Sequence, residues 1–205
     1  MSDAADAEPG QHATTRIEAF SDGVIAIVAT IMVLELHEPA LAFLSGDFWV
    51  VFEELAPDLS VYALSFLMVA ILLVNHHVII HRARRATASL YWWNANLLFW
   101  MALIPLSTAT YGKHPLTPLA ASFYGLILAA NMVSLALLRR SVVREHRATI
   151  SSGVVERAVK AWRRDLALAA LYLVSIPLAY LWVYLPIAIF VAVPVMNLVS
   201  RLQTA

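Results

Sequence analysis

The sequence of 205 residues contains no cysteine, and only 14% of its residues are charged. The absence of cysteine excludes disulfide bonds and thiolate metal sites, and it leaves no sign of the redox state of the compartment. An average protein carries about 25% charged residues, and this shortfall, together with a mean hydropathy of +0.74, excludes a soluble domain. The formal net charge is zero, so the composition gives no indication of a nucleic acid partner.

The motifs of common enzyme classes are missing as well. The sequence has no glycine-rich nucleotide loop, no paired-carboxylate hydrolase pattern and no HExxH zinc motif. We therefore predict that the protein is not an enzyme and that it holds no metal ion. The potassium-filter sequence TVGYG is also absent, and no long internal repeat supports an inverted-repeat transporter.

Long runs without Asp, Glu, Lys or Arg predict an all-α, polytopic integral membrane protein. A membrane-spanning helix needs about 20 apolar residues, and the 23 uncharged residues 59–81 and the 27 between Arg85 and Lys113 both reach that length. The 35 uncharged residues 166–200 would form a helix of about 50 Å, so we predict two short spans joined by a tight turn near residues 180–186. The six transmembrane helices are predicted at residues 16–36, 59–80, 91–110, 119–138, 166–182 and 185–201.

The basic residues predict the orientation of these helices. Thirteen Lys and Arg residues fall on the side that holds the N-terminal tail, residues 81–90, residues 139–164 and the C-terminus, and Lys113 alone falls on the other side. By the positive-inside rule, both termini are predicted to be cytoplasmic. The same count supports six spans, because a single span over residues 166–200 would place Arg201 outside.

The residues before the first helix are polar, with Pro9 and Gly10 among them. They lack the basic start of a signal peptide. We predict a flexible cytoplasmic tail at residues 1–15, followed by a single six-helix transmembrane domain at residues 16–201. The absence of cysteine and of a cleavable signal fits a multi-pass protein of a bacterial inner membrane.

The first predicted helix begins with charged and hydroxylated residues. Only twelve uncharged residues separate Asp22 from Glu35, which is too short for a membrane span. The span must therefore include Asp22 and Ser21. A carboxylate inside a membrane helix is energetically costly, and it indicates a functional residue or an internal partner.

Helical spacing divides this helix into two stripes. At 100° per residue, the side of Asp22 carries the small residues Ala26 and Ala29, which suit close contact with another helix. The second stripe is apolar, lies about 120–180° from Asp22 with Thr30 at its border, and consists of Ile27, Ile31 and Leu34. In a membrane this stripe can face lipid, a neighbouring helix or a pore, and the residues alone leave that choice open.

The first helix also carries a motif, Arg16-x-x-x-Phe20-Ser21-Asp22, followed by Ala26-Ile27, Thr30 and Leu34-Glu35. This motif resembles the first helix of the lysosomal potassium channel family and its bacterial relatives, the transmembrane protein 175 family. Further pieces similar to the family are His76-His77 at the end of the second span, and Trp92-x-Asn94 with Leu106-Ser107-Thr108 in the third. Beyond residue 112 the resemblance rests on the number of spans and on the basic segment.

The resemblance implies a potassium-selective cation channel whose pore is lined by the first helix. Because six-span bacterial members of the family are homotetramers, we expect four copies of this chain in membrane lipid, with K⁺ as the permeant ion and no cofactor. An apolar constriction, which can also act as a hydrophobic gate, is implied at Ile27, Thr30, Ile31 and Leu34.

The resemblance further implies a structural polar cluster that anchors the first helix against the second and third spans. Its members are Arg16, Phe20, Ser21, Asp22, His77, Trp92 and Asn94. The two-stripe pattern agrees with this division, because it places Asp22 away from the apolar stripe. We therefore interpret Asp22 as a structural residue and not as an ion ligand.

Two other functions stay open. A proton-coupled carrier would use Asp22 and the histidines as a relay, and it predicts a saturable flux that is lost when Asp22 is changed. A membrane assembly protein without transport predicts no flux at all. The histidines His76 and His77 either titrate and make opening sensitive to pH or are simply hydrogen-bonded.

Overall fold

The computed structural model describes residues 9–36, 44, 46–83, 85–146 and 152–202. Within these ranges the regular structure is entirely helical, which confirms the predicted all-α fold. The helices are α1 (Pro9–Leu34), α3 (Phe48–Ile80), α4 (Ala88–Ala102), α5 (Ile104–Lys113), α6 (Pro118–His146), α7 (Ser152–Leu181) and α8 (Leu185–Leu202). In this part of the chain, α1, α3, α6 and α7 are long and apolar enough to cross a membrane, and α8 is a shorter apolar helix.

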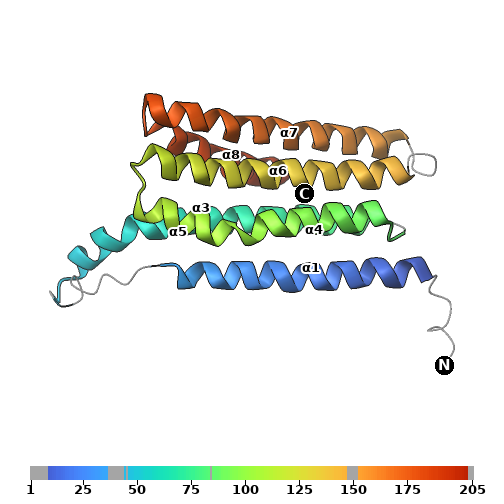
Figure 1. Cartoon of the computed structure of the whole chain (residues 1–205), viewed down its shortest axis with the longest axis horizontal. Coiled ribbons are helices and arrows are strands. Elements are labelled where there is room, and N and C mark those ends of the chain that lie inside the picture. The colour runs from blue at the N-terminus through green and yellow to red at the C-terminus, as the bar shows by residue number, and fades with distance from the viewer. Residues whose placement is uncertain (1–8, 37–43, 45, 84, 147–151, 203–205) are drawn as a thin grey trace.

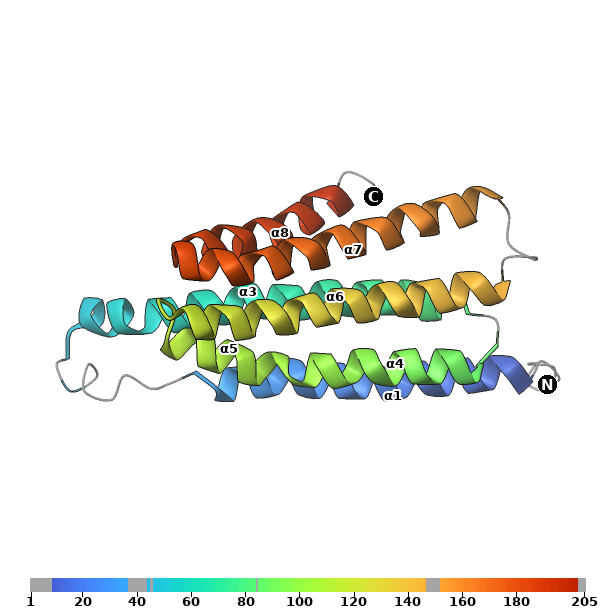
Figure 2. The same ribbon diagram turned by 45° about the horizontal axis from the view of Figure 1, so that its top comes forward.

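The helices run roughly side by side in an elongated bundle (Figures 1 and 2). Helix α6 packs on α7 and α4, while α3 contacts α5, α6 and α8. Helix α1 packs on α3, α4 and α5, and in both views it lies on the opposite side of the bundle from α7 and α8. The helix that carries the sequence motif is therefore at the edge of the single chain.

Several helices extend beyond the predicted spans. Helix α1 starts at Pro9, so residues 9–15, predicted as part of a loose tail, are helical; proline is compatible with the first turn of a helix. The rest of that tail lies outside the described residues. Helix α3 starts at Phe48, where the Asp47 side chain accepts a hydrogen bond from the Trp49 amide. It continues through Pro57, because a proline removes only one of the many hydrogen bonds of this long helix.

The third predicted span, residues 91–110, consists of two helices. Helix α4 ends at Ala102 and α5 begins at Ile104, with Pro105 in its first turn. Pro105 has no amide hydrogen to donate to the carbonyl four residues earlier, so the continuous hydrogen-bond pattern ends there.

The C-terminal half holds the remaining long helices. Helix α7 begins at Ser152, 14 residues before the predicted span at 166–182, and α6 continues to His146. The basic segment is therefore helical on both sides of residues 147–151. Helices α7 and α8 occupy the long uncharged run and are separated by a turn in which the Leu185 amide donates to the Trp182 carbonyl.

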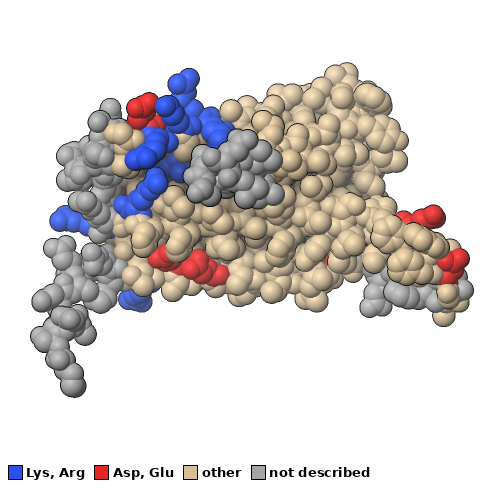
Figure 3. Space-filling model, turned by 180° about the vertical axis from the view of Figure 1, so that it is seen from behind, with Lys and Arg blue, Asp and Glu red and all other residues tan. Residues whose placement is uncertain are grey.

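The charged residues are segregated along the long axis of the bundle. On the face shown in Figure 3, the Lys and Arg atoms gather at one end, and the charged atoms visible at the opposite end are acidic. The start of α1, the α3–α4 connection, the end of α6 and the start of α7 share one end in Figure 1. That this basic end faces the cytoplasm stays a prediction.

Polar and aromatic contacts hold the other end of the bundle together. The Thr108 hydroxyl of α5 donates to Ser65 Oγ of α3 at 2.8 Å, and Ser65 Oγ lies 2.8 Å from the Tyr124 hydroxyl of α6. The Tyr124 ring meets Phe190 of α8 edge-on, with centroids 4.9 Å apart. These contacts fix the helices on which α1 rests.

Candidate functional site

Helix α1 buries one stripe of side chains against the bundle. Its members are spaced three or four residues apart, as expected for one face of a helix, and each is at most 4% exposed: Ile17, Ser21, Ile25, Val28 and Met32. They pack against α3, α4 and α5. This buried stripe is a third face of the helix. It differs both from the side of Asp22 and from the apolar stripe that begins at Ile27.

The apolar stripe of α1 faces outward. Ile27 is 58% exposed, Ile31 41% and Leu34 78%. Three large apolar side chains in a row on one helix face form a contiguous apolar strip, a feature that marks an interaction surface or contact with lipid. We call Ile27, Ile31 and Leu34, with Thr30 beside them, the outer face of α1.

Thr30 satisfies its hydroxyl donor within its own helix. Its Oγ1 lies 3.0 Å from the Ala26 carbonyl oxygen and 2.9 Å from the Ile27 carbonyl oxygen. A hydroxyl has one donor and two acceptor lone pairs. With the donor directed to the backbone, the exposed oxygen keeps acceptor capacity toward the outer face, which is the chemistry that a cation requires.

A hydrogen-bonded chain links α1 to α3 and α4. The Ser21 hydroxyl donates to the Ile17 carbonyl at 2.8 Å, and the Asn94 amide nitrogen donates to Ser21 Oγ at 2.9 Å. The Asn94 amide oxygen then accepts from His76 Nε2 at 2.7 Å. Ser21, Asn94 and His76, which we call the polar chain, are all buried.

The polar chain contains His76 where the sequence predicted His77. His77 is exposed, and its Nδ1 lies 2.8 Å from Glu18 Oε1 on α1. Adjacent residues of a helix point about 100° apart, so the pair of histidines does not itself reveal which one faces inward. The apolar spacing does not separate them either, because Leu72 and Ile79 flank His76 at the same offsets at which Leu73 and Ile80 flank His77.

Other members of the predicted cluster lie apart from the polar chain. Arg16 and Phe20 are exposed on α1, and Trp92 on α4 is 76% exposed. Asp22 is half-buried, and its Oδ1 is a buried atom with no hydrogen-bond partner in the described part of the chain.

The small residues on the Asp22 side of α1 border an open groove between α1 and α3. The groove has a volume of about 500 Å³, and Asp22, Ala26 and Ala29 line it opposite Val69 and His77. A second groove of about 300 Å³ lies on the other side of the outer face, between α1 and Pro105 of α5. The outer face of α1 is thus flanked by two hollows.

A buried ion pair was missed by the sequence analysis. Arg139 Nε of α6 donates to Asp165 Oδ2 of α7 at 2.8 Å, and Arg139 Nη2 donates to Asn75 Oδ1 of α3 at 3.3 Å. Both charged side chains are almost fully buried. Arg139 and Asp165 each stand at the end of an uncharged run, so both side chains were expected to be exposed to water at the ends of their helices. An Arg and an Asp at matching ends of two neighbouring helices are nevertheless a signal for pairing.

Metal-ligand chemistry is represented by one group of side chains in the described residues. Glu18, His77 and His81 each offer one ligand atom, and these atoms lie within 4.8 Å of one another. Both histidines are exposed, and the absence of a bound metal stays a prediction.

Comparison with known proteins identifies the family. Residues 16–105 match the sequence profile of the endosomal/lysosomal potassium channel TMEM175. A protein of Chamaesiphon minutus, named a potassium channel, is 32% identical over 188 residues, which cover 88% of this chain and 91% of the relative. The chain belongs to the TMEM175 family.

Two further matches extend the relationship within the TMEM175 family. A protein of a Chryseobacterium species, also named a potassium channel, is 35% identical over 129 residues, or 63% of this chain and 65% of the relative's length. The crystal structure of a lysosomal potassium-selective channel TMEM175 homolog from Chamaesiphon minutus superposes with a TM-score of 0.77 at 28% identity, covering 91% of this chain and 97% of that one. The chain is therefore a multi-pass membrane protein with the TMEM175 channel fold.

Proposed function

We propose that this protein is a potassium-selective cation channel of four identical chains and that the outer face of α1 lines its pore. The observation that carries the proposal is the exposure of Ile27, Ile31 and Leu34 on the helix that also holds the family motif. The names of the bacterial relatives and of the similar crystal structure support potassium as the permeant ion.

The constriction works through size and hydration. Four copies of the outer face bring rings of Ile27, Ile31 and Leu34 around one axis, and an apolar neck of this kind gates a pore by excluding water. Sodium holds its water shell more tightly than potassium, so a narrow apolar neck opposes sodium more strongly. The acceptor oxygen of Thr30 replaces part of the lost hydration beside the neck.

The tetramer places a neighbouring copy against the groove between α1 and α3. Ala26 and Ala29 line this groove, and small residues let membrane helices approach closely. Asp22 lies in the same groove with an unpartnered buried oxygen, so a donor from the adjacent chain completes its hydrogen bonding. The polar chain fixes α1 from behind while its outer face meets the ions.

The carrier alternative has one observation in its favour. The carboxylate of Asp22 and the ring of His77 line the same groove, which is an arrangement suited to passing a proton. Replacing Asp22 by Asn separates the two functions: a channel retains potassium current, whereas a proton-coupled carrier loses its flux.

The proposed function is tested by current recordings from the purified full chain in liposomes, with potassium and sodium gradients opposed. We expect a reversal potential close to that of potassium. Ile27→Asn widens and hydrates the neck, so it is expected to move the reversal potential toward that of sodium. The control is Leu173→Asn, an equally drastic change at a 45% exposed site on α7, on the far side of the bundle from α1.

An unchanged reversal potential for Ile27→Asn would contradict the assignment of the neck to Ile27. A reversal midway between the two ions in the unmodified protein would contradict potassium selectivity while keeping the pore.

A further inference from the structure

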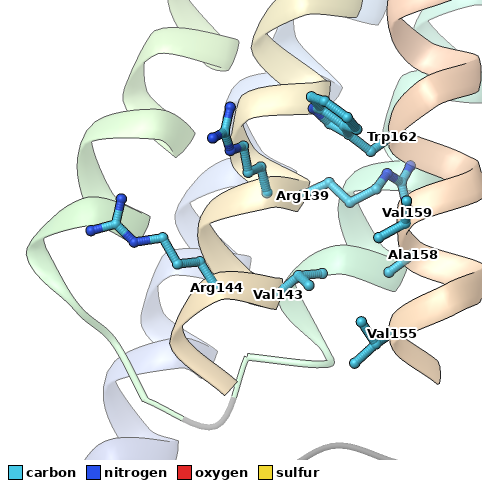
Figure 4. Close-up of a pocket in the computed structure, with 8 residues that line it drawn as sticks. Arg139, Val143, Arg144, Val155, Ala158, Val159 and Trp162 are labelled. Carbon is cyan, nitrogen blue, oxygen red and sulfur yellow. The ribbon is translucent and has the colours of Figure 1, made fainter. Parts of the chain in front are cut away.

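A pocket outside the proposed pore lies between α6 and α7 at the basic end of the bundle. It has a volume of about 320 Å³. Figure 4 shows Val143 of α6 across from Val155 and Ala158 of α7, with Trp162 also contributed by α7. Arginines of α6 also border the pocket, and the Arg144 guanidinium extends away from α7 in this view. The pocket thus combines apolar walls with basic side chains at its rim.

Two of these arginines carry charge that the chain itself leaves uncompensated. Arg139 is neutralised by its buried ion pair with Asp165. Arg140 and Arg144 are exposed, and neither has an acidic side chain within 4 Å in the part of the chain that the structure describes. The Arg140 guanidinium lies 5.7 Å from the centre of the Trp162 ring, a cation–π contact that holds it at the pocket.

The position of the pocket matches the level of lipid headgroups. Arg139 directly follows the uncharged run of α6, and the uncharged run of α7 begins at Leu166, three residues after Arg163. The pocket therefore adjoins the ends of two apolar runs, where the hydrocarbon region of a bilayer gives way to headgroups. Trp162 is typical of this interface.

We propose that this pocket binds the phosphate of an anionic phospholipid, held by Arg140 and Arg144. Guanidinium groups pair with phosphate oxygens through two parallel hydrogen bonds, and basic pockets between membrane helices on the cytoplasmic side suit acidic headgroups. The apolar walls at Val143, Val155 and Val159 take the start of an acyl chain. A lipid fits both halves of the pocket, whereas free phosphate uses only the arginines.

The test is native mass spectrometry of the full chain purified from membranes containing phosphatidylcholine and phosphatidylglycerol. We expect retained phosphatidylglycerol, with about a fivefold loss of affinity for Arg140→Gln or Arg144→Gln, since each basic residue near the surface contributes about 1 kcal/mol. The control is Arg157→Gln, an exposed arginine of α7 that does not line the pocket. Val159→Trp keeps every charge but fills the pocket, and it is expected to reduce retention as well.

Three results would overturn the proposal. One is equal retention by Arg140→Gln, Arg144→Gln and the unmodified chain, and another is an equal loss for Arg157→Gln, which would indicate nonspecific attraction to the basic segment. The third is release of the lipid by excess inorganic phosphate with unchanged retention for Val159→Trp, which would assign the arginines to free phosphate. None of these measurements depends on ion conduction, so their outcome is independent of whether the protein is a channel.

Discussion

The buried polar chain of Ser21, Asn94 and His76 joins α1, α4 and α3 through one side-chain hydrogen bond at each step. Asn94 is its central member, because its amide nitrogen serves Ser21 and its oxygen serves His76. Asn94→Ala leaves both neighbours without their partner, and burying an unpaired polar group costs about 1–3 kcal/mol. We expect a lower melting temperature in detergent by tryptophan fluorescence. Ser60→Ala, which removes an exposed hydroxyl bonded only to its own helix, is expected to have no such effect.

The ion pair between Arg139 and Asp165 gives a second prediction for single residues. Asp165→Asn leaves a buried guanidinium without its countercharge, which costs about 3–5 kcal/mol. Glu156→Gln, at an exposed pair with Lys160, is expected to change stability far less, because water and salt screen an exposed ion pair. The thermal stabilities of the two variants in one detergent test this contrast. Equal stability of the two variants would contradict a structural role for the buried pair.

Residue roles were only partly predictable from the sequence. Ser21 and Asn94 were expected to lie together, and the structure brings them within hydrogen-bond distance. The choice of His76 over His77, and the pairing of Arg139 with Asp165, depend on how α3, α6 and α7 rotate against one another. That rotation is set by packing between helices, and a single sequence carries little of it.

Helix α6 approaches α7 closely at one glycine. A Cβ atom added at Gly125 would lie 2.6 Å from Ser175 Oγ and 3.3 Å from the Tyr172 carbonyl oxygen. Gly125→Ala is therefore expected to lower stability by about 1–3 kcal/mol through overpacking. Adding Ser175→Ala removes the nearest atom and is expected to restore part of the loss.

A glycine on α1 provides the matched comparison. A Cβ atom at Gly23 meets no atom within 4 Å. Gly23→Ala is expected to leave stability unchanged or to raise it by about 0.5–1 kcal/mol, since alanine favours the helical state. Melting curves of the two variants check the pair, and a loss at Gly23 equal to that at Gly125 would contradict the close approach of α6 and α7.

The sequence predicted which stretches are helical better than it predicted where each helix begins and ends. Uncharged runs mark the stretches that lie in hydrocarbon, and the long helices contain those runs. The first charged residue, however, ends only the apolar stretch and not the hydrogen-bonded helix. For this reason α7 begins at Ser152 and α3 at Phe48, well before the predicted spans.

The single chain leaves one side of α1 uncovered, and the proposed tetramer would cover it. Four copies of the 22.6-kDa chain are expected in native mass spectra. Ala26→Trp inserts a large ring into the groove between α1 and α3, so it is expected to weaken assembly by about 1–3 kcal/mol. Ala170→Trp, at an exposed site on α7, is the control. A tetramer that tolerates Ala26→Trp as well as Ala170→Trp would contradict the placement of the neighbouring copy.

The assembly of several chains was the feature hardest to predict from residue patterns alone. The apolar stripe of α1 fits lipid, another helix or a pore equally well by composition, and the resemblance to a channel family decided the expectation. The single chain adds that this stripe is exposed and flanked by grooves.

The most direct test of the proposed pore uses the absence of native cysteine. Ile31→Cys and Leu34→Cys each introduce the sole thiol of the chain, and potassium currents are recorded while a water-soluble, positively charged thiol reagent is added. If the outer face of α1 lines the pore, the current falls in both variants and persists in Leu173→Cys on α7. Currents that persist in both α1 variants, or that fall in Leu173→Cys, would show that ions take another path.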